Sequence, residues 1–341
     1  MNVTKTQRLH YFDALKAFTI FLVISGHCIQ YLLHSHHNDE VTFRLIYSFH
    51  MPLFMMISGF FSFSAIKRDF WSSTTTRARM LLLPVATLSL LFAVKKLFLE
   101  NENFFLIFFN GFGGMLWFLK TAFTCFLLTK LCYLCGKYKY IAVFVTLLLS
   151  QLAAVTNIDP YGFMTKIHAM YPSFLIGLLI RTKWDYFVKH IKEIVCISST
   201  IFVGALVFIS NNSELSLLNL FPIGGGILQL YIKFYKLITA FSGSIFFISL
   251  FAYFFFKKTD NKIYDTICYC GRNTLGIYMF QFVYLEVIIN GMIYFDNANF
   301  FVFNFIIVPL TSLFLLMLCI ATIKIIKMNK YTAFLLLGEK I

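Results

Sequence analysis

The chain has 341 residues, of which 59% are hydrophobic and only 13% are charged, and its formal net charge is +14. This composition excludes a soluble globular protein, because the apolar runs are too many and too long for a water-exposed fold. The positive charge does not indicate nucleic-acid binding, because the Lys and Arg residues stand mostly at the ends of apolar runs. The sequence therefore predicts an all-α polytopic membrane protein.

The apolar runs predict a bundle of about ten transmembrane helices. No cleavable signal peptide is expected at the first run, because it contains Lys16 and lacks a small-x-small cleavage site. Ten is an even number, so both termini lie on one side, and most of the 29 Lys and Arg residues fall on that side. This bias predicts that both termini are cytoplasmic. The expected spans are 11–33, 42–64, 78–99, 113–135, 139–157, 166–182, 191–210, 233–256, 272–294 and 300–323.

The connections between these runs are too short to form a second domain. The longest lie at about 100–112, 157–165 and 211–232, and none carries a repeat or a low-complexity tract. We therefore expect residues 1–341 to form a single integral membrane domain, with no separate soluble domain. The functional site is then expected within the bundle.

The first apolar run carries three ionisable residues on one helix face. At about 100° per residue, Asp13, Lys16 and His27 fall within about 60° of one another. Ionisable groups at membrane depth are costly unless they pair or line a wet cavity, so this face is a candidate site. A structural alternative is that Asp13 pairs with Lys16 across one turn and that His27 hydrogen-bonds to a neighbouring helix.

The second run contains a histidine at a similar depth. The segment FHMPLFMMISGFF at 49–61 holds His50, two residues before Pro52, which opens the backbone hydrogen-bond ladder. The first two helices run in opposite directions, which places His27 about 9 Å and His50 about 12 Å below the outer boundary. The two imidazoles could therefore share one layer.

The ninth run carries a polar face and an acidic residue. Thr274, Tyr278 and Gln281 lie within about 60° of one another, which suits either a polar cavity wall or hydrogen bonds between helices. Glu286 lies about 12 Å below the outer boundary, so it could orient an imidazole. It points about 120° away from the polar face, which weakens that role.

The eight cysteines do not predict a metal site. A C-x-x-C at 132–135 and a C-x-C at 268–270 are present, but neither has the histidines or carboxylates of a closed zinc site. We expect free thiols and no metal.

Several short motifs follow one another along the chain. They are the D-x-x-K-x10-H pattern of Asp13, Lys16 and His27, FHMPLF…SGFF at 49–61, RARMLLLP at 77–84, LWFL at 116–119, YPSFLIGLL at 171–179 and GRNTLGIYMFQ at 271–281. Single pieces such as LWFL are weak signals. The six in this order resemble the acyltransferase-3 family of bacterial integral membrane acyltransferases, and the resemblance covers nearly the whole chain.

This resemblance implies a ten-helix O-acetyltransferase-like enzyme of the bacterial plasma (inner) membrane. Such an enzyme moves an acyl group, usually acetyl, from cytoplasmic acyl-CoA to a hydroxyl of a cell-surface polysaccharide or lipid-linked glycan. The family's essential histidine falls on His27 and its basic residue on Lys16, where many members have Arg and can bind phosphate with two hydrogen bonds. Many relatives have His where this chain has Gln281. Many relatives also carry a periplasmic hydrolase-like domain, and no such domain is expected in residues 1–341. The membrane part is therefore expected to act alone or with a separate partner.

Chemistry assigns an expected role to each candidate residue. Attack of a sugar hydroxyl on a thioester needs a base near pH 7, and imidazole suits that task. His27 either deprotonates the acceptor or accepts the acyl group itself, and the sequence leaves both routes open. We expect a catalytic group of His27, Lys16 and Asp13. We expect substrate contacts from His50, Trp117, Lys120, Tyr278, Gln281 and Glu286.

The donor's phosphates need cationic partners at the cytoplasmic side. Arg77 and Arg79, together with Lys16, are the expected partners, although basic residues there also follow from the positive-inside rule. Trp117 and Lys120 lie one turn apart on the fourth span and could stack on and pair with a ligand. The structural alternative is an interfacial Trp anchor with Lys120 near the outer end of the span.

Three functional classes remain open from the sequence. An acyltransferase predicts a titratable group facing a cavity, a glycan or lipid flippase or exporter predicts a polar tunnel without an indispensable base, and a structural subunit predicts neither. The expected partners are acyl-CoA (acetyl-CoA) as donor, a glycan acceptor and membrane lipids. No permanently bound cofactor and no nucleic acid are expected, and a homo-oligomer is left open.

Overall fold

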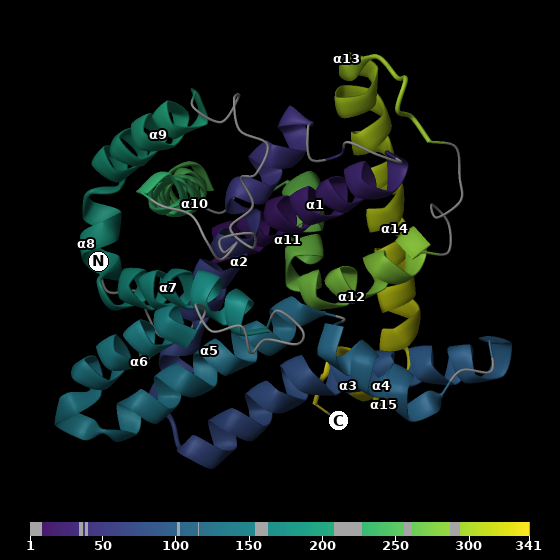
Figure 1. Ribbon diagram of the computed structural model, residues 1–341, viewed down its shortest axis with the longest axis horizontal. Coiled ribbons are helices and arrows are strands. Elements are labelled where there is room, and N and C mark those ends of the chain that lie inside the picture. Colours follow the sequence, from purple (N-terminus) through teal and green to yellow (C-terminus); the bar gives the residue numbers. More distant parts are fainter. Residues whose placement is uncertain are drawn as a thin grey trace. The chain divides into compact units, whose positions relative to one another are not determined.

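The computed structural model describes residues 9–33, 37, 40–100, 103–114, 116–153, 163–207, 227–255, 261–286 and 294–340. Over these residues the chain forms helices joined by short connections, and this part contains no β-strand (Figure 1). The expected all-α class is confirmed.

The helices follow the apolar runs of the sequence. They are α1 His10–Leu32, α2 Val41–Lys67, α3 Phe70–Glu100, α4 Phe104–Gly114, α5 Trp117–Leu134, α6 Lys139–Ala153, α7 Phe163–Thr182, α8 Trp184–Lys189, α9 Ile191–Val207, α10 Ile227–Phe255, α11 Lys262–Arg272, α12 Thr274–Tyr284, α13 Phe300–Val302, α14 Val308–Lys327 and α15 Lys330–Leu337. A 3-10 turn lies at Gly136–Tyr138 and a π-helical turn at Phe303–Ile307.

Among the described helices, six are long and apolar enough to cross a membrane. This supports a multi-pass membrane protein. A helix lies in each of the ten expected ranges, but those within α6, α7, α9 and α12 do not meet the length and hydropathy of a span. The count of about ten spans and the cytoplasmic termini therefore stay predictions. The six are 10–32, 41–67, 70–98, 117–134, 234–255 and 300–327.

Two expected boundaries differ from the structure. Most of the segment 100–112, expected to be a connection, lies in helix α4, because its apolar sequence FFLIFFNGF supports a short helix. The expected span 272–294 begins instead at a break, since α11 ends and α12 begins on either side of Asn273. Asn is a poor interior helix residue, and here its side-chain amide donates to the carbonyl of Tyr269 at 2.8 Å.

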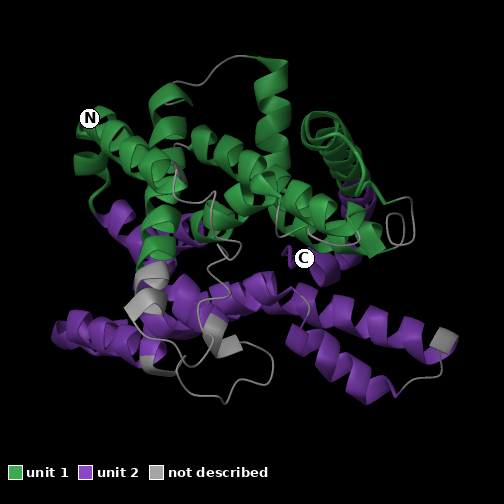
Figure 2. Ribbon diagram, turned by 45° about the horizontal axis from the view of Figure 1, so that its top comes forward, with its two compact units in different colours: residues 1–54, 183–219, 226–321 green, residues 55–182, 220–225, 322–341 purple. Residues whose placement is uncertain are grey.

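The chain divides into two compact units (Figure 2). Unit 1 comprises residues 1–54, 183–219 and 226–321, and unit 2 comprises residues 55–182, 220–225 and 322–341. Helices α2 and α14 each contribute to both. The expectation of a single membrane domain over the whole chain stays a prediction.

Within unit 1, α1 is the central element. It packs against α10, α11 and α12, and α9 packs against α10. A side chain at Gly271 of α11 would place its Cβ 1.7 Å from the Asp13 carbonyl oxygen of α1, so this close approach of two backbones requires glycine. The Ser25 hydroxyl of α1 donates to the Ser312 hydroxyl of α14 at 3.0 Å.

Within unit 2, α3 packs against α4, α5 and α15, and α5 packs against α6 and α7. The second half of α2 meets α7 through two glycines. A Cβ at Gly59 would lie 2.0 Å from the Phe174 carbonyl oxygen, and one at Gly177 would lie 1.9 Å from that of Met56. Small residues thus let these two apolar helices approach closely, as is common in membrane bundles.

Lys130 accounts for one of the charges inside an apolar run. Its side chain is 2% exposed. Its ammonium donates to the carbonyls of Ala65, Arg68 and Asp69 at 2.9, 2.5 and 3.2 Å and to the Ser73 hydroxyl at 2.7 Å. A cation at these carbonyls satisfies the open C-terminal end of α2 and complements its dipole.

Candidate active site

His27 lies on α1 and is partly exposed. Its Nδ1 forms a hydrogen bond of 2.9 Å with the side-chain oxygen of Gln30, one turn further along the same helix. Its ring packs against Phe282 of α12, with ring centroids 4.7 Å apart. The imidazole is thus held by contact with an aromatic ring and, through one nitrogen, by an amide.

Helix α2 brings a second histidine to the same place. The His50 side chain lies near that of His27. Tyr47 lies beside both, with ring centroids 6.5 Å from His27 and 4.7 Å from His50. The two imidazoles therefore lie near one another in unit 1. We define His27, Gln30, Tyr47, His50 and Phe282 as the imidazole cluster.

His50 differs from His27 in exposure and in its hydrogen bond. It is 2% exposed, and its Nδ1–H donates to the backbone carbonyl of Ile46 at 2.7 Å. A carbonyl can only accept, so this contact places the proton of neutral His50 on Nδ1. His27, the more accessible of the two, is the better placed to meet a substrate.

The residues of α12 differ in how they relate to the cluster. The Tyr278 ring lies 5.7 Å from the Phe282 ring, measured between centroids, and Tyr278 is also near Tyr47, so it adjoins the cluster. Gln281 is fully buried, and neither amide atom has a hydrogen-bond partner among the described residues. An unsatisfied buried amide costs about 1–3 kcal/mol, which favours a polar ligand at this position.

Glu286 lies at the end of α12 and is exposed. It lies near Tyr31 of α1. Its expected role in orienting an imidazole stays a prediction.

Asp13 and Lys16 pair with one another at the other end of α1. The Lys16 ammonium lies 3.7 Å from an Asp13 carboxylate oxygen, with the aspartate side chain 5% and the lysine side chain 24% exposed. Eleven residues of helix separate Lys16 from His27, about 16 Å along the axis. The three residues share a helix face but do not form one cluster of touching groups.

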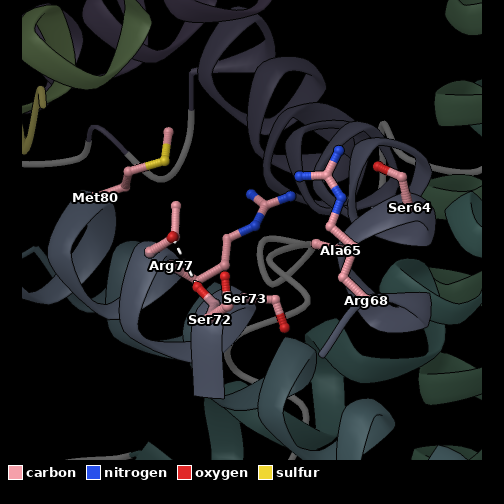
Figure 3. A pocket seen from close by; sticks show the side chains of 8 residues that line it. Ser64, Ala65, Arg68, Ser72, Ser73, Arg77 and Met80 are labelled. Carbon is pink, nitrogen blue, oxygen red and sulfur yellow. Dashed lines mark hydrogen bonds between the residues drawn. The ribbon is translucent and has the colours of Figure 1, made fainter. Parts of the chain in front are cut away.

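Unit 2 contains a pocket with a different character (Figure 3). Its volume is about 250 Å³, and it is formed where α2 ends and α3 begins. Figure 3 shows the guanidinium groups of Arg68 and Arg77 on the same side of this pocket, and the two interact electrostatically. We call this the arginine pocket. It is lined by Ser64, Ala65, Arg68, Ser72, Ser73, Thr76, Arg77 and Met80.

Arg77 is held in place by its own contacts. One of its terminal nitrogens donates to the Phe61 carbonyl at 3.1 Å, and its guanidinium lies 5.6 Å from the Phe126 ring centroid. Two neighbouring guanidinium groups repel one another, and hydroxyls around them can donate hydrogen bonds. This arrangement favours an anion with several oxygens, such as a phosphate.

Arg79 does not line the arginine pocket. Two residues on a helix are about 200° apart, so Arg79 points away from the side that Arg77 occupies. At Arg79 the backbone of α3 lies close to Gly338, which directly follows α15, since a Cβ at Gly338 would lie 2.6 Å from the Arg79 carbonyl oxygen. The structure thus separates two arginines that the sequence grouped together.

Trp117 and Lys120 belong to unit 2, and Lys120 is engaged within the protein. Its ammonium donates to the carbonyls of Phe112 and Gly113, at the end of α4. Leu116, in the left-handed region at φ +48°, forms the sharp turn that lets α5 follow α4 so closely. The Trp117 ring lies 5.6 Å from the Lys166 ammonium. These contacts favour the structural alternative for Lys120.

Gln30, Tyr47 and Arg68 were not singled out in the sequence. Gln30 follows His27 by three residues and Tyr47 precedes His50 by three, so each lies on the same helix face as its histidine. That spacing is the signal that could have found them. Arg68 stands directly after α2, where the positive-inside rule already accounts for a basic residue.

Among the described residues, no three His, Cys, Asp or Glu side chains lie together so as to hold a metal ion.

Comparisons with known proteins agree with the motifs. A family model described as an acyltransferase domain, that of the acyltransferase-3 family, matches residues 9–326. No solved structure matches the chain.

Two curated relatives match parts of the chain. Nodulation protein NolL of Sinorhizobium fredii is 36% identical over 129 residues, which are 35% of this chain and 35% of that protein. Nodulation protein NolL of Mesorhizobium japonicum is 45% identical over 78 residues, which are 22% of this chain and 21% of that protein. The chain thus spans about a third and about a fifth of the length of these relatives.

Proposed function

Because the chain belongs to the acyltransferase-3 family, whose model spans residues 9–326, we propose that it is a membrane-bound O-acyltransferase. The donor is acyl-CoA, with acetyl or another short acyl group, and the acceptor is a hydroxyl of a cell-surface polysaccharide or lipid-linked glycan. The observation that carries this proposal is the partly exposed His27 imidazole, whose Nδ1 is hydrogen-bonded to Gln30. Its second nitrogen is then available as a base.

The proposed reaction uses His27 as a general base. The acceptor hydroxyl oxygen attacks the thioester carbonyl carbon while Nε2 of His27 takes the hydroxyl proton. The C–S bond breaks, and the imidazolium returns the proton to the coenzyme thiolate, so the enzyme ends as it began. A two-step route, in which Nε2 itself takes the acyl group and passes it on, uses the same nitrogen.

The arginine pocket is the proposed site for phosphates of the donor. Its support is the convergence of Arg68 and Arg77 with the hydroxyls of Ser72, Ser73 and Thr76. Arginine suits phosphate because its planar fork can donate two parallel hydrogen bonds. Lys16 is the proposed second contact with the donor, and Asp13 keeps its ammonium in position.

The acceptor is proposed to lie beside the cluster residues of α2 and α12. His50 and Tyr278 adjoin His27 through Tyr47 and Phe282. The unsatisfied amide of buried Gln281 would be a partner for a sugar hydroxyl. Many relatives have His at this position, and the Gln281 amide of this chain can position a substrate without carrying charge.

The proposed location is the bacterial plasma membrane, with both termini in the cytoplasm. The support is the placement of most Lys and Arg residues on that side of the expected spans. A reporter protein fused after Ile341 should therefore lie in the cytoplasm. Finding that reporter on the outer side of the plasma membrane would overturn this orientation.

Acyl transfer is tested by two measurements on the same strain. Glycans from cells with and without the protein are compared by mass spectrometry, and the purified protein in lipid nanodiscs is given acetyl-CoA labelled in its acetyl group. We expect a mass difference of one acyl group and label in the glycan fraction. If neither appears while the glycan still reaches the surface only with the protein present, the chain is a flippase or exporter instead.

A further inference from the structure

Gln30 makes two hydrogen bonds through a single oxygen. Its side-chain Oε1 lies 2.9 Å from Nδ1 of His27 and accepts from the Tyr47 hydroxyl at 3.0 Å. An amide oxygen carries two lone pairs and can only accept, so both partners must donate. The nitrogen of His27 that faces Gln30 then carries the proton.

Tyr47 is itself held firmly where it meets Gln30. Its ring lies 4.0 Å from that of Phe43 and 4.7 Å from that of His50, measured between centroids. On α1, Gly26 leaves room for this ring, because a Cβ at Gly26 would lie 2.7 Å from a Tyr47 ring carbon. The hydroxyl of Tyr47 is therefore directed at the Gln30 amide by packing on two sides.

From these contacts we infer that Gln30, oriented by Tyr47, is a positioning residue that holds His27 in the Nδ1–H tautomer. Nε2 of His27 then keeps its lone pair for the acceptor hydroxyl. This inference rests on the proposed function, in which Nε2 is the base. Neither Gln30 nor Tyr47 touches the reacting atoms, and both act through His27.

An amide is a suitable orienting group at this depth. A carboxylate would accept the same hydrogen bond, but an added charge inside a membrane-spanning helix is costly. The amide oxygen gives the same direction to the imidazole without that cost. It also leaves His27 neutral until it receives the acceptor's proton, as a general base requires.

The first test separates positioning from packing with two substitutions of similar size. Gln30→Met fills the same volume without an acceptor, whereas Gln30→Glu keeps an oxygen there in either protonation state. Groups that orient a metal-ligating imidazole typically contribute about 10- to 100-fold, and we expect Gln30→Met to lower kcat by a similar factor with KM for acetyl-CoA unchanged. Gln30→Glu should retain most of the transfer, and Tyr47→Phe should lose less than Gln30→Met.

The matched control is Gln151→Met in unit 2. The Gln151 amide is likewise hydrogen-bonded, but as a donor, to the His168 carbonyl at 3.1 Å, and it lies outside the cluster. All rates are normalised to folded protein in the membrane. Gln151→Met should leave kcat unchanged. Equal kcat for Gln30→Met and Gln30→Glu would overturn the inference, because a packing role does not distinguish an acceptor from a thioether.

The second test does not depend on enzymatic activity. Protein carrying ¹⁵N-labelled histidine is studied by NMR in detergent, and the His27 signals are assigned by their loss in His27→Gln. In the wild type we expect the Nδ1–H tautomer of His27, and in Gln30→Met a mixture of both tautomers. A wild-type His27 that carries its proton on Nε2 would overturn the inference even if acyl transfer is observed. A correct tautomer with no transfer would instead overturn the proposed function.

Discussion

The imidazole cluster in unit 1 and the arginine pocket in unit 2 treat their polar groups in opposite ways. Around His27, polar side chains satisfy one another. The Tyr47 hydroxyl donates to the Gln30 side-chain oxygen, and the same oxygen is hydrogen-bonded to the His27 imidazole. In the pocket, two guanidinium groups of like charge lie side by side and are surrounded by hydroxyls. The first arrangement suits a neutral base, whereas the second suits an anion supplied from outside.

This difference indicates how a membrane enzyme can divide its work. Self-satisfied polar groups are tolerated deep in an apolar bundle, because no charge has to be buried. Convergent positive charge belongs near the ends of helices, where water and charged ligands reach it. Substitutions in the cluster should therefore lower the rate of transfer, and substitutions in the pocket should lower the affinity for the donor.

The largest effect is expected from His27→Gln. Loss of a positioned general base typically lowers kcat about 10² to 10⁴-fold, while acetyl-CoA binding should stay unchanged. Transfer is measured with labelled acetyl-CoA and binding by calorimetry on the purified protein. The control is His190→Gln, at the end of α8, which should transfer normally. If His27→Gln transfers at the wild-type rate per folded molecule, the cluster is not the catalytic site.

A second comparison sets Arg77→Met against Arg79→Met on the same helix. Hydrogen bonds to charged groups are worth about 1.5–3 kcal/mol, so Arg77→Met should weaken donor binding about 10- to 100-fold. Arg79 does not line the pocket, and Arg79→Met should bind the donor normally. Both variants are titrated with coenzyme A in nanodiscs. Equal weakening by the two would show that overall positive charge, rather than the pocket, attracts the donor.

A smaller effect is expected at Lys16. If its ammonium contacts the donor, Lys16→Met should weaken coenzyme A binding by about tenfold, and Lys16→Arg should keep most of the affinity. The pairing of Lys16 with Asp13 could also serve stability alone. In that event both variants would bind coenzyme A as the wild type does, and only their thermal midpoints would change.

The smallest effect on the enzyme's reaction is expected from Lys120→Met. Its ammonium satisfies two carbonyls at the end of α4, and losing it should cost about 1–3 kcal/mol of stability. Thermal unfolding in detergent should therefore shift to lower temperature, with donor affinity and kcat per folded molecule unchanged. A selective loss of affinity for substrate would return Lys120 to the binding site.

Much of the fold is readable from the sequence because helices in membranes are local structures. Apolar length and the 3.6-residue period locate most ends of α1, α2, α3, α5, α10 and α14 to within a few residues. The same arithmetic of rise along a helix predicts that His27 and His50 share a layer, and the structure brings them together. Short-range features on one helix, such as the pairing of Asp13 with Lys16, follow from spacing alone.

What only the tertiary structure decides is which side chains from different helices meet. The helical period says that Gln30 lies near His27, but not that a hydroxyl from α2 arrives to orient its amide. The sequence contains lysines inside apolar runs, but it does not show that the ammonium groups of Lys120 and Lys130 donate to backbone carbonyls at the ends of other helices. Closeness in the sequence also groups Arg77 with Arg79, although of these two only Arg77 lines the pocket with Arg68. The reason is physical: a helix satisfies its backbone within itself, whereas its side chains find partners only when packing sets the rotation and register of its neighbours.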